Sequence, residues 1–322
     1  KKILPGTWTF RRKRNPSGEI TKHKGRYCVR GDLEESDEEH SSPVCSFASV
    51  RLFLILTLVL KWKSCSIDFA NAFVQSKMPD DKPMWIHLPR GFKSTKGLGY
   101  CLRLKKSLYG TSIAPLLWYQ SAVKVFTDIG FHQSKYDCCV LLRRDAIVVL
   151  YVDDAGIAAA EESTIDKIVS DIREKGFELT KEGSFSEFLG IKITKLENGA
   201  LELTQKGLID KILEATGMTD CRPNWLPASS TALGPDPDGE PMNEDWSYPS
   251  IVGMLLYLSS NTRPDIQYAV SQVCRYSATP KQSHATAVKM IVRYLKRTCD
   301  KGTIINPRSD LNLDLYVDAD FA

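Results

Sequence analysis

The feature that most constrains this 322-residue chain is an apolar stretch, residues 146–160, with two adjacent carboxylates at its centre. Aliphatic residues precede Tyr151-Val152-Asp153-Asp154, and small or aliphatic residues follow it. Such a run with a polar centre predicts two buried strands joined by a tight turn. Two neighbouring carboxylates in these surroundings repel each other and lose solvation. A divalent cation would resolve that repulsion. A surface turn is the alternative interpretation, since Asp-Asp is common in turns.

A third carboxylate, Asp68, lies near the end of another predicted apolar strand, residues 66–69. Two-metal phosphoryl or nucleotidyl transfer needs acidic oxygens from separate strands that converge on cations about 4 Å apart. Mg²⁺ suits such a site because it prefers oxygen ligands and keeps positions open for phosphate and water. Spacing alone does not require that Asp68 meets Asp153, because an Asp near a strand end is usually a cap or turn residue.

The remaining pattern alternates hairpins with amphipathic helices, which predicts an α+β fold and argues against a doubly wound nucleotide-binding fold. Ser163 with Asp166 predicts a capping box for one helix. Pro115 and Gly130 predict the start and end of another. The expected strands are the hairpins 7–30, 146–160 and 188–204 with single strands at 66–69 and 84–88; the expected helices are 48–62, 115–129, 163–176, 205–216, 248–258 and 284–296.

Charge is more informative in its distribution than in its total, which is only +4. Residues 11–30 contain eight Lys or Arg residues and a single acid, Glu19. A cluster of this density indicates a surface for phosphates, although a solvated strand pair would look the same. The apolar fraction of 43% is that of a globular protein.

Nine cysteines occur without a CxxC pair or zinc-finger spacing, so we expect buried thiols in a reducing compartment. The most apolar run, residues 52–60, is shorter than the roughly 20 residues that span a bilayer. It therefore predicts a buried helix and no membrane partner. The chain begins without Met and ends inside a predicted strand, and we expect it to be an excerpt from a larger polyprotein.

The YVDD hairpin resembles the polymerase signature of reverse transcriptases, and further segments follow in the order of the copia-type retrotransposon family. The resemblance covers nearly the whole chain. Its segments are Lys24–Gly31, Ser42–Val44 with Arg51, Asp68–Phe73, Pro89–Phe92, Leu104–Gly110, Ala114-Pro115 with Trp118-Tyr119, Phe188–Ile191, Tyr248 with Val252-Gly253, Thr262–Ile266 and Arg293–Lys296.

This resemblance implies a right-hand polymerase with an antiparallel palm sheet. Fingers and palm would occupy residues 1–200, and a largely helical thumb and connection residues 201–310. The first strand of a truncated RNase H domain would then follow at 311–322. The implied activity is RNA-directed DNA synthesis from dNTPs on an RNA or DNA template with a primer. The implied setting is a polyprotein with integrase and RNase H, in cytoplasmic retroelement particles.

The resemblance also assigns roles by position. Asp68, Asp153 and Asp154 become the catalytic carboxylates that hold two Mg²⁺ ions, for which Mn²⁺ could substitute. Arg26 and Lys24 would contact the incoming triphosphate. Phe73 becomes the aromatic gate beneath the sugar, with core packing as its alternative role. Ile113 takes the position beside the nucleotide where the family has Gln.

Residues 111–117 depart from the family pattern. Ile113 stands in place of Gln, and Ser112 and Leu116 stand in place of two basic residues. A lost hydrogen bond to a charged partner costs roughly 1.5–3 kcal/mol. One alternative is therefore a degenerate remnant that binds nucleic acid without polymerising. Another is a different two-metal enzyme, such as a cyclase or nuclease, and a structural role is a third. Asp318 resembles the first RNase H metal ligand, but its later partners are missing and we expect no RNase H activity.

Overall fold

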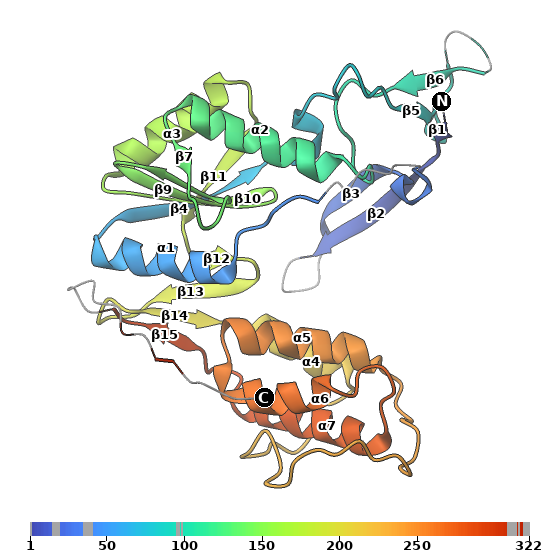
Figure 1. The fold of residues 1–322 in the computed structure, drawn as a ribbon, viewed down its shortest axis with the longest axis vertical. Coiled ribbons are helices and arrows are strands. Elements are labelled where there is room, and N and C mark those ends of the chain that lie inside the picture. The colour runs from blue at the N-terminus through green and yellow to red at the C-terminus, as the bar shows by residue number, and fades with distance from the viewer. Residues whose placement is uncertain are drawn as a thin grey trace. The chain divides into compact units, whose positions relative to one another are not determined.

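The computed structural model describes residues 2–14, 20–34, 41–94, 97, 99–307, 314 and 316–317. The chain divides into two compact units: Lys1–Phe53 with Leu60–Ser184, and Leu54–Val59 with Phe185–Ala322 (Figure 1). Both units combine helices with antiparallel strands, so the predicted α+β class is confirmed. No helix among the described residues is long and apolar enough to span a membrane.

The first unit is built on a six-stranded sheet in which every neighbouring pair is antiparallel. The predicted hairpin 146–160 forms its two central strands, and their nine aliphatic or small buried side chains come from both faces of the sheet. In spatial order the strands are β11 (Leu179–Ser184), β4 (Lys63–Phe69), β10 (Asp154–Ala159), β9 (Ala146–Tyr151), β8 (Val140–Arg143) and β7 (His132–Gln133).

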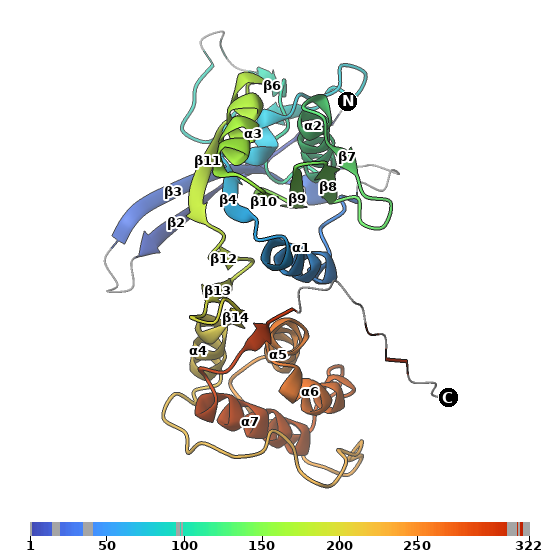
Figure 2. The same cartoon turned by 90° about the vertical axis from the view of Figure 1, so that its left-hand side faces the viewer.

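Helices α2 (Ala114–Asp128) and α3 (Glu162–Glu174) cover one face of this sheet, and the start of α1 (Phe47–Val59) lies on the other face (Figure 2). The buried stripe of α2 includes Trp118 and Phe126. The helix ends as the sequence predicts, because Gly130 adopts φ +93°, a left-handed conformation that glycine tolerates.

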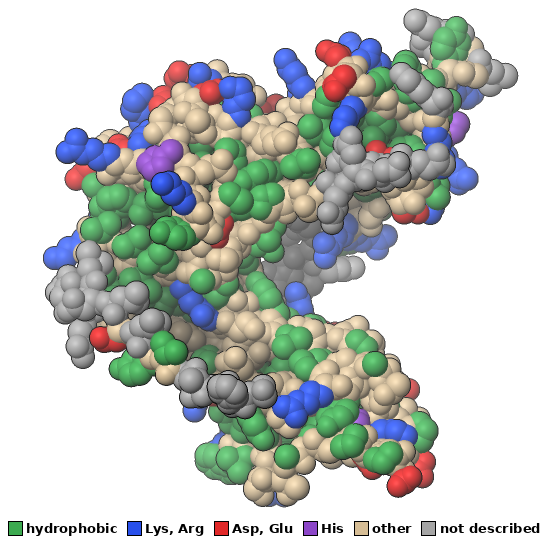
Figure 3. All heavy atoms as spheres, in the orientation of Figure 1, with side chains coloured by type: hydrophobic (Ala, Val, Ile, Leu, Met, Phe, Trp, Pro, Cys, Tyr) green, Lys and Arg blue, Asp and Glu red, His purple; other side chains and the backbone are tan. Residues whose placement is uncertain are grey.

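A second structural feature of this unit is the long hairpin of β2 (Gly6–Arg14) and β3 (Ile20–Val29), which the sequence also predicts. Its turn, residues 15–19, lies outside the described residues. Basic side chains gather along this hairpin in the space-filling view (Figure 3). The smaller elements nearby are β1 (Ile3–Leu4), β5 (Trp85–His87), β6 (Cys101–Arg103) and the 3-10 turns η1 (Gly31–Leu33) and η2 (Ala72–Gln75).

The second unit packs helices around an apolar core beside a small antiparallel sheet. Its helices are amphipathic; in α7 the buried positions recur every three or four residues, which turns one face inward. The strands are β12 (Glu187–Phe188), β13 (Ile191–Lys195), β14 (Leu201–Thr204) and β15 (Thr303–Ile305); the helices are α4 (Lys206–Ala215), α5 (Tyr248–Asn261), η3 (Pro264–Ile266), α6 (Gln267–Cys274) and α7 (Gln282–Arg297).

The main segment of the first compact unit ends at Ser184, within the region 1–200 that the resemblance assigns to fingers and palm. The chain divides after Ser184 because β13 pairs with β14, and β14 pairs in turn with β15 from the end of the chain. The hairpin 188–204 therefore belongs to the second unit. Of the predicted RNase H strand, 311–322, only three residues are described, and Asp318 lies outside the described residues.

Two local predictions are wrong. The capping box does not form: α3 begins at Glu162 without a side-chain cap, and the carboxylate of Asp166 instead accepts a hydrogen bond from Lys181 at 2.8 Å. The cysteines are free thiols, but they are not uniformly buried. Cys45, Cys65 and Cys139 are buried, whereas Cys138 is exposed in the turn before β8.

A buried guanidinium connects η3 to α7 in the second unit. Arg263, whose side chain is 1% exposed, donates two hydrogen bonds to Asp265, at 2.9 and 2.7 Å. It also donates to the carbonyl and hydroxyl oxygens of Thr298. Burial raises the pKa of Asp265, but hydrogen bonds from Arg263 and Tyr294 outweigh burial and leave that pKa below its usual value. Asp265 therefore stabilises the fold above its unfolded-state pKa and loses this effect as the pH falls.

We expect Arg263→Lys to lower the free energy of unfolding by about 3 kcal/mol, because an ammonium cannot reproduce the two-pronged contact with Asp265 in a buried site. Urea unfolding followed by circular dichroism at pH 7 measures the change. Arg275→Lys, at an exposed position, is the matched control and should shift stability by less than about 0.5 kcal/mol. Equal effects of the two substitutions would contradict a stabilising role for this contact.

Candidate active site

The two central carboxylates lie in and beside a strained turn. Val152 and Asp153 connect β9 to β10, and Val152 adopts φ +54°, which is costly for a β-branched residue. Two hydrogen bonds hold the turn. The indole of the buried Trp118 donates to the carbonyl of Val152, and the amide of Phe69 donates to the carbonyl of Asp153 at 2.9 Å. A strained backbone held this firmly is typical of a functional site.

The register between β4 and β10 brings the third carboxylate to this turn. Asp68 is the direct Cα partner of Asp154 in the antiparallel ladder. Directly opposite residues point to the same face, with Cβ atoms about 4.5–5.5 Å apart. The neighbours of Asp68 in β4, Ile67 and Phe69, point the other way and are each 1% exposed. The sheet therefore presents Asp68 and Asp154 together on one face, with Asp153 beside them in the turn.

Burial and like charge act together on Asp154. Burial, which has the largest effect, and the neighbouring carboxylates Asp153, Asp68 and Glu182 together raise its pKa to about 6. Glu182 lies on β11, opposite Ser66 of β4, and accepts a hydrogen bond from that hydroxyl at 3.5 Å. Sequence reasoning missed Glu182, because nothing in its local pattern indicates that β11 pairs with β4.

These carboxylates suit an oxygen-preferring divalent cation by the chemistry of their donors, since charge neutralisation would relieve the repulsion among them. They are not drawn into one tight cluster. Among the described residues, ligand atoms within 4.8 Å of one another occur instead at Asp137, Cys138 and Cys139. The Asp137 carboxylate has a structural role there, because it accepts hydrogen bonds from Ser46 and Ser49 at the start of α1 and from the amide of Cys139.

A stack of three side chains leads from the hairpin β2–β3 to the carboxylates. The guanidinium of Arg26 lies 4.8 Å from the ring centre of Tyr109, and that ring lies 5.1 Å from Phe73. Burial raises the pKa of Tyr109; Arg26 lowers it, and Asp153 and Asp68 raise it. Tyr109 therefore lies in the fields of both the cation and the acids.

One hydrogen-bond donor of Arg26 has no acceptor among the described residues. Its Nε atom is buried and has no hydrogen-bond partner among the described residues. Lys24 lies two residues away in β3 and therefore on the same face, where its ladder partner is Arg11. This face of the hairpin is basic, and the buried N–H of Arg26 is available to an acceptor such as a phosphate oxygen.

Phe73 lies in η2, and its carbonyl accepts a hydrogen bond from the buried hydroxyl of Ser107. A cavity of about 270 Å³ opens beside its ring and is also lined by Trp118 and Val152 of the strained turn. The aromatic ring therefore lies next to the turn that carries Asp153. Tyr109, which stacks on it, was part of the quoted family segment but was not identified as a site residue.

Ile113, which the resemblance places beside the nucleotide, is buried at the start of α2. Its side chain is 7% exposed, and it occupies the N-cap position of α2. An apolar buried side chain offers no hydrogen bond to a nucleotide. The neighbouring Ser112 contacts the fold rather than a ligand, since its amide and hydroxyl both donate to the carboxylate of Glu34, at 3.2 and 2.7 Å.

Comparison with known proteins agrees with this geometry. The family model "Reverse transcriptase (RNA-dependent DNA polymerase)" matches residues 1–230. The retrovirus-related Pol polyprotein from transposon RE1 of Arabidopsis thaliana is 31% identical over 99% of this chain and 22% of its own length. The corresponding polyprotein from transposon TNT 1-94 of Nicotiana tabacum is 30% identical over 100% of this chain and 25% of its own. The chain thus spans about a quarter of these relatives or less.

Two further matches are more distant. A putative transposon Ty5-1 protein of Saccharomyces cerevisiae is 27% identical over 79% of this chain and 82% of its own length. Among solved structures, a foamy viral protease–reverse transcriptase in complex with double-stranded DNA aligns with a TM-score of 0.46 at 15% identity. That alignment covers 92% of this chain and 44% of the viral chain.

We expect Asp154→Asn to stabilise the protein in divalent-free buffer at pH 7.5 by about 1–2 kcal/mol. A carboxyl whose pKa rises from 3.8 to about 6 on folding disfavours the folded state once it is ionised, so the parent loses stability as the pH rises through this interval. The substitution removes the charge, and its advantage should vanish near pH 4. Thermal unfolding at both pH values measures it.

The exposed Asp220→Asn is the matched control and should change stability little at either pH. Adding Mg²⁺ should then raise the unfolding temperature of the parent by more than that of the Asp154→Asn protein. An Asp154→Asn protein no more stable than the control at pH 7.5 would refute the assigned repulsion.

Proposed function

Since the chain belongs to the reverse transcriptase family, whose model it matches over residues 1–230, we propose that it is the polymerase portion of a copia-type retrotransposon enzyme. It would extend a primer with deoxynucleotides on an RNA or DNA template. The observation that carries this proposal is the pairing of Asp68 with Asp154 beside the strained turn of Asp153. Carboxylates from two neighbouring strands then converge where nucleotidyl transfer needs them.

In the proposed reaction the 3′-oxygen of the primer forms a bond to the α-phosphorus of a dNTP. The bond from that phosphorus to the pyrophosphate oxygen breaks, and the hydroxyl proton passes to water. Reverse transcriptases generally use divalent metal ions. Mg²⁺, or Mn²⁺ in its place, supplies Lewis acidity that lowers the pKa of the hydroxyl and offsets charge on the phosphate. Asp68, Asp153 and Asp154 would hold these ions.

The chain's basic face would bind the triphosphate. Arg26 suits a phosphate because guanidinium N–H groups match two oxygens at once, and its buried Nε lacks a protein acceptor. Tyr109 would hold the guanidinium plane in place by stacking on it. Lys24, on the same face of β3, would add charge without the same directional preference.

Phe73 would select deoxynucleotides because its ring would sterically exclude a 2′-hydroxyl. Its ring lies against Tyr109 and beside the cavity next to Val152, so a sugar bound above Asp153 would approach it. A 2′-hydroxyl would then meet the ring edge. We therefore expect Phe73→Val to raise the ratio of kcat/KM for rNTPs to that for dNTPs by about ten- to a hundredfold. Single-nucleotide extension with dTTP and UTP measures this ratio.

Phe92→Val, which shortens an exposed ring elsewhere in the same unit, is the control and should leave the ratio unchanged. If Phe73 serves only in packing, the variant would lose stability and activity with both nucleotides, and the ratio would stay at the parental value.

The central test is extension of an oligo(dT) primer on poly(rA) with Mg²⁺ by residues 1–322. We expect the parent to incorporate dTTP, the Asp153→Asn variant to lose incorporation by at least a thousandfold, and the exposed Asp220→Asn variant to match the parent. Product without added template and primer would instead favour a different two-metal enzyme.

A second candidate function rests on the buried Ile113, which stands where family members have Gln. The chain could then be a remnant that binds nucleic acid but does not polymerise. A folded parent that shows salt-dependent primer–template binding and no incorporation would favour this candidate. Recovery of incorporation by Ile113→Gln would then identify this position as the defect.

A further inference from the structure

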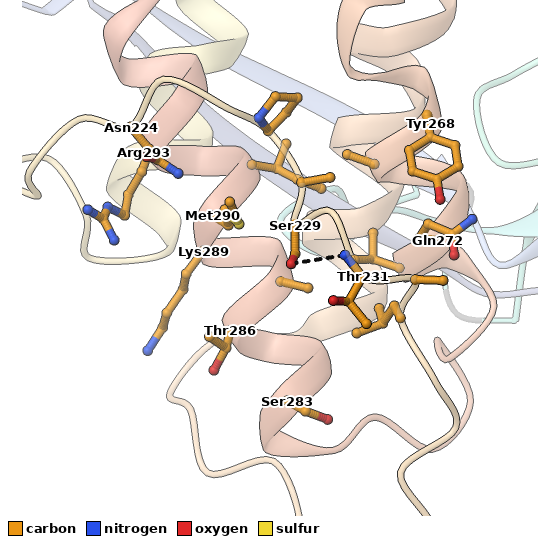
Figure 4. A pocket seen from close by; sticks show the side chains of 18 of the residues that line it. Asn224, Ser229, Thr231, Tyr268, Gln272, Ser283, Thr286, Lys289, Met290 and Arg293 are labelled. Carbon is orange, nitrogen blue, oxygen red and sulfur yellow. Dashed lines mark hydrogen bonds between the residues drawn. The ribbon is translucent and has the colours of Figure 1, made fainter.

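A cavity of about 500 Å³ lies in the second unit and shares no lining residue with the candidate active site. Its walls are α6, α7 and the extended segment 224–233, which runs between them without regular secondary structure (Figure 4). The volume is within the range of small-molecule sites, roughly 300–1,000 Å³.

Small side chains keep this cavity open. Ala269 of α6, Ala287 of α7 and Ala228 of the extended segment all line it. Longer apolar side chains, Met290 and Leu233, complete the walls without filling the space. The cavity is partly open to solvent, and its apolar walls lack close packing contacts on the open side. A ligand with an apolar body would restore those contacts.

One polar group in this wall has no partner. Gln272 of α6 is 8% exposed, and its side-chain amide forms no hydrogen bond with any residue of the described chain. Its amide atoms are not among the buried, unpartnered atoms of the described residues, so they are open to the space of the cavity and can pair with a ligand there. Tyr268 lies one helical turn earlier on the same face, at the α6 side of the cavity in Figure 4. Its hydroxyl likewise forms no hydrogen bond with the described residues, and its side chain is 61% exposed.

The charged residues of the wall are already engaged. Lys289 donates to the carboxylate of Glu244 at 2.6 Å, and Nε of Arg293 donates to the carbonyl of Arg222 at 2.7 Å. In Figure 4 the ends of both side chains point away from the centre of the cavity. The cavity therefore offers a largely apolar space. The amide of Gln272 and the hydroxyl of Tyr268 are among the polar groups of its wall, and the charged ends of Lys289 and Arg293 are directed out of it.

We propose that this cavity binds a small, flat, uncharged heterocycle whose edge carries an adjacent hydrogen-bond donor and acceptor, as a lactam does. The ring would lie between the alanines of α6 and α7. Its edge would pair with the amide of Gln272, which can donate and accept at once. This site is independent of the polymerase proposal, because it shares no residue with the carboxylates or with the basic hairpin.

The test uses 2-quinolone, a bicyclic lactam, and N-methyl-2-quinolone, in which the donor is blocked. Binding to the full chain is measured by isothermal titration calorimetry or by ligand-observed NMR. We expect 2-quinolone to bind with an affinity about tenfold higher than that of the N-methyl compound, the difference made by one hydrogen bond to the amide of Gln272. This comparison needs no variant, so it holds even if a substitution impairs folding.

Two substitutions then assign the site. Gln272→Met keeps the length of the side chain but removes its hydrogen bonds, and should bring both compounds to the same affinity. Ala287→Leu fills the cavity and should abolish binding of both. Gln267→Met, at an exposed position of the same helix, is the matched control and should leave the tenfold difference intact. Unfolding temperatures confirm that each variant is folded.

The proposal is overturned if the parent binds neither compound, if it binds both equally, or if the preference for 2-quinolone survives Gln272→Met. Equal binding would describe an apolar cavity without a specific edge contact. None of these outcomes depends on whether the chain polymerises.

Discussion

The pairing of β4 with β10 is the constraint on which the rest of the first unit depends. Side chains alternate between the two faces of a strand, so a slip of one residue would exchange Asp68 with Phe69. The observed register sends Phe69 into the core, where its ring lies 5.0 Å from that of Trp118. The same register sets Asp68 opposite Asp154. The hydrophobic burial that holds the sheet together thus also positions the acids.

This arrangement opposes stability at the site itself. Asp154 has an elevated pKa because burial and three neighbouring carboxylates disfavour its charge, and Val152 keeps a backbone conformation that a β-branched residue avoids. Trp118 and Phe69 hold the turn by hydrogen bonds to its two carbonyl groups. A packed apolar sheet below and around the acids offsets these costs.

Local pattern predicted most elements of the fold and the candidate carboxylates, because each depends on a few consecutive residues. The hairpin 146–160, the strand of Asp68 and the end of α2 at Gly130 are of this kind. What the pattern could not supply was pairing over long distances. Glu182 lies near the carboxylates only because β11 pairs with β4. Asp166, the predicted capping residue, instead accepts a hydrogen bond from Lys181 of another element. The hairpin 188–204 belongs to the second unit for the same reason, since β15 pairs with β14.

The connection between the hairpin β2–β3 and the sheet shows why the departures at residues 111–117 can leave the acids intact. Gly31 and Gly110 allow the two backbones to approach, since a Cβ at Gly31 would meet the carbonyl oxygen of Gly110 at 2.0 Å. The amide of Val29 then donates to the carbonyl of Tyr109, which sets that ring between Arg26 and Phe73. The divergent residues begin just after this contact.

Their contacts in the structure are with the start of α2 and with the loop before α1, because Ser112 binds Glu34 and Ile113 is buried at the helix cap. None of these contacts involves β4, β9 or β10. Changes at residues 111–117 can therefore alter how a nucleotide is held while the register that assembles the carboxylates stays the same. Under the proposed function, nucleotide affinity and metal binding would therefore depend on different residues.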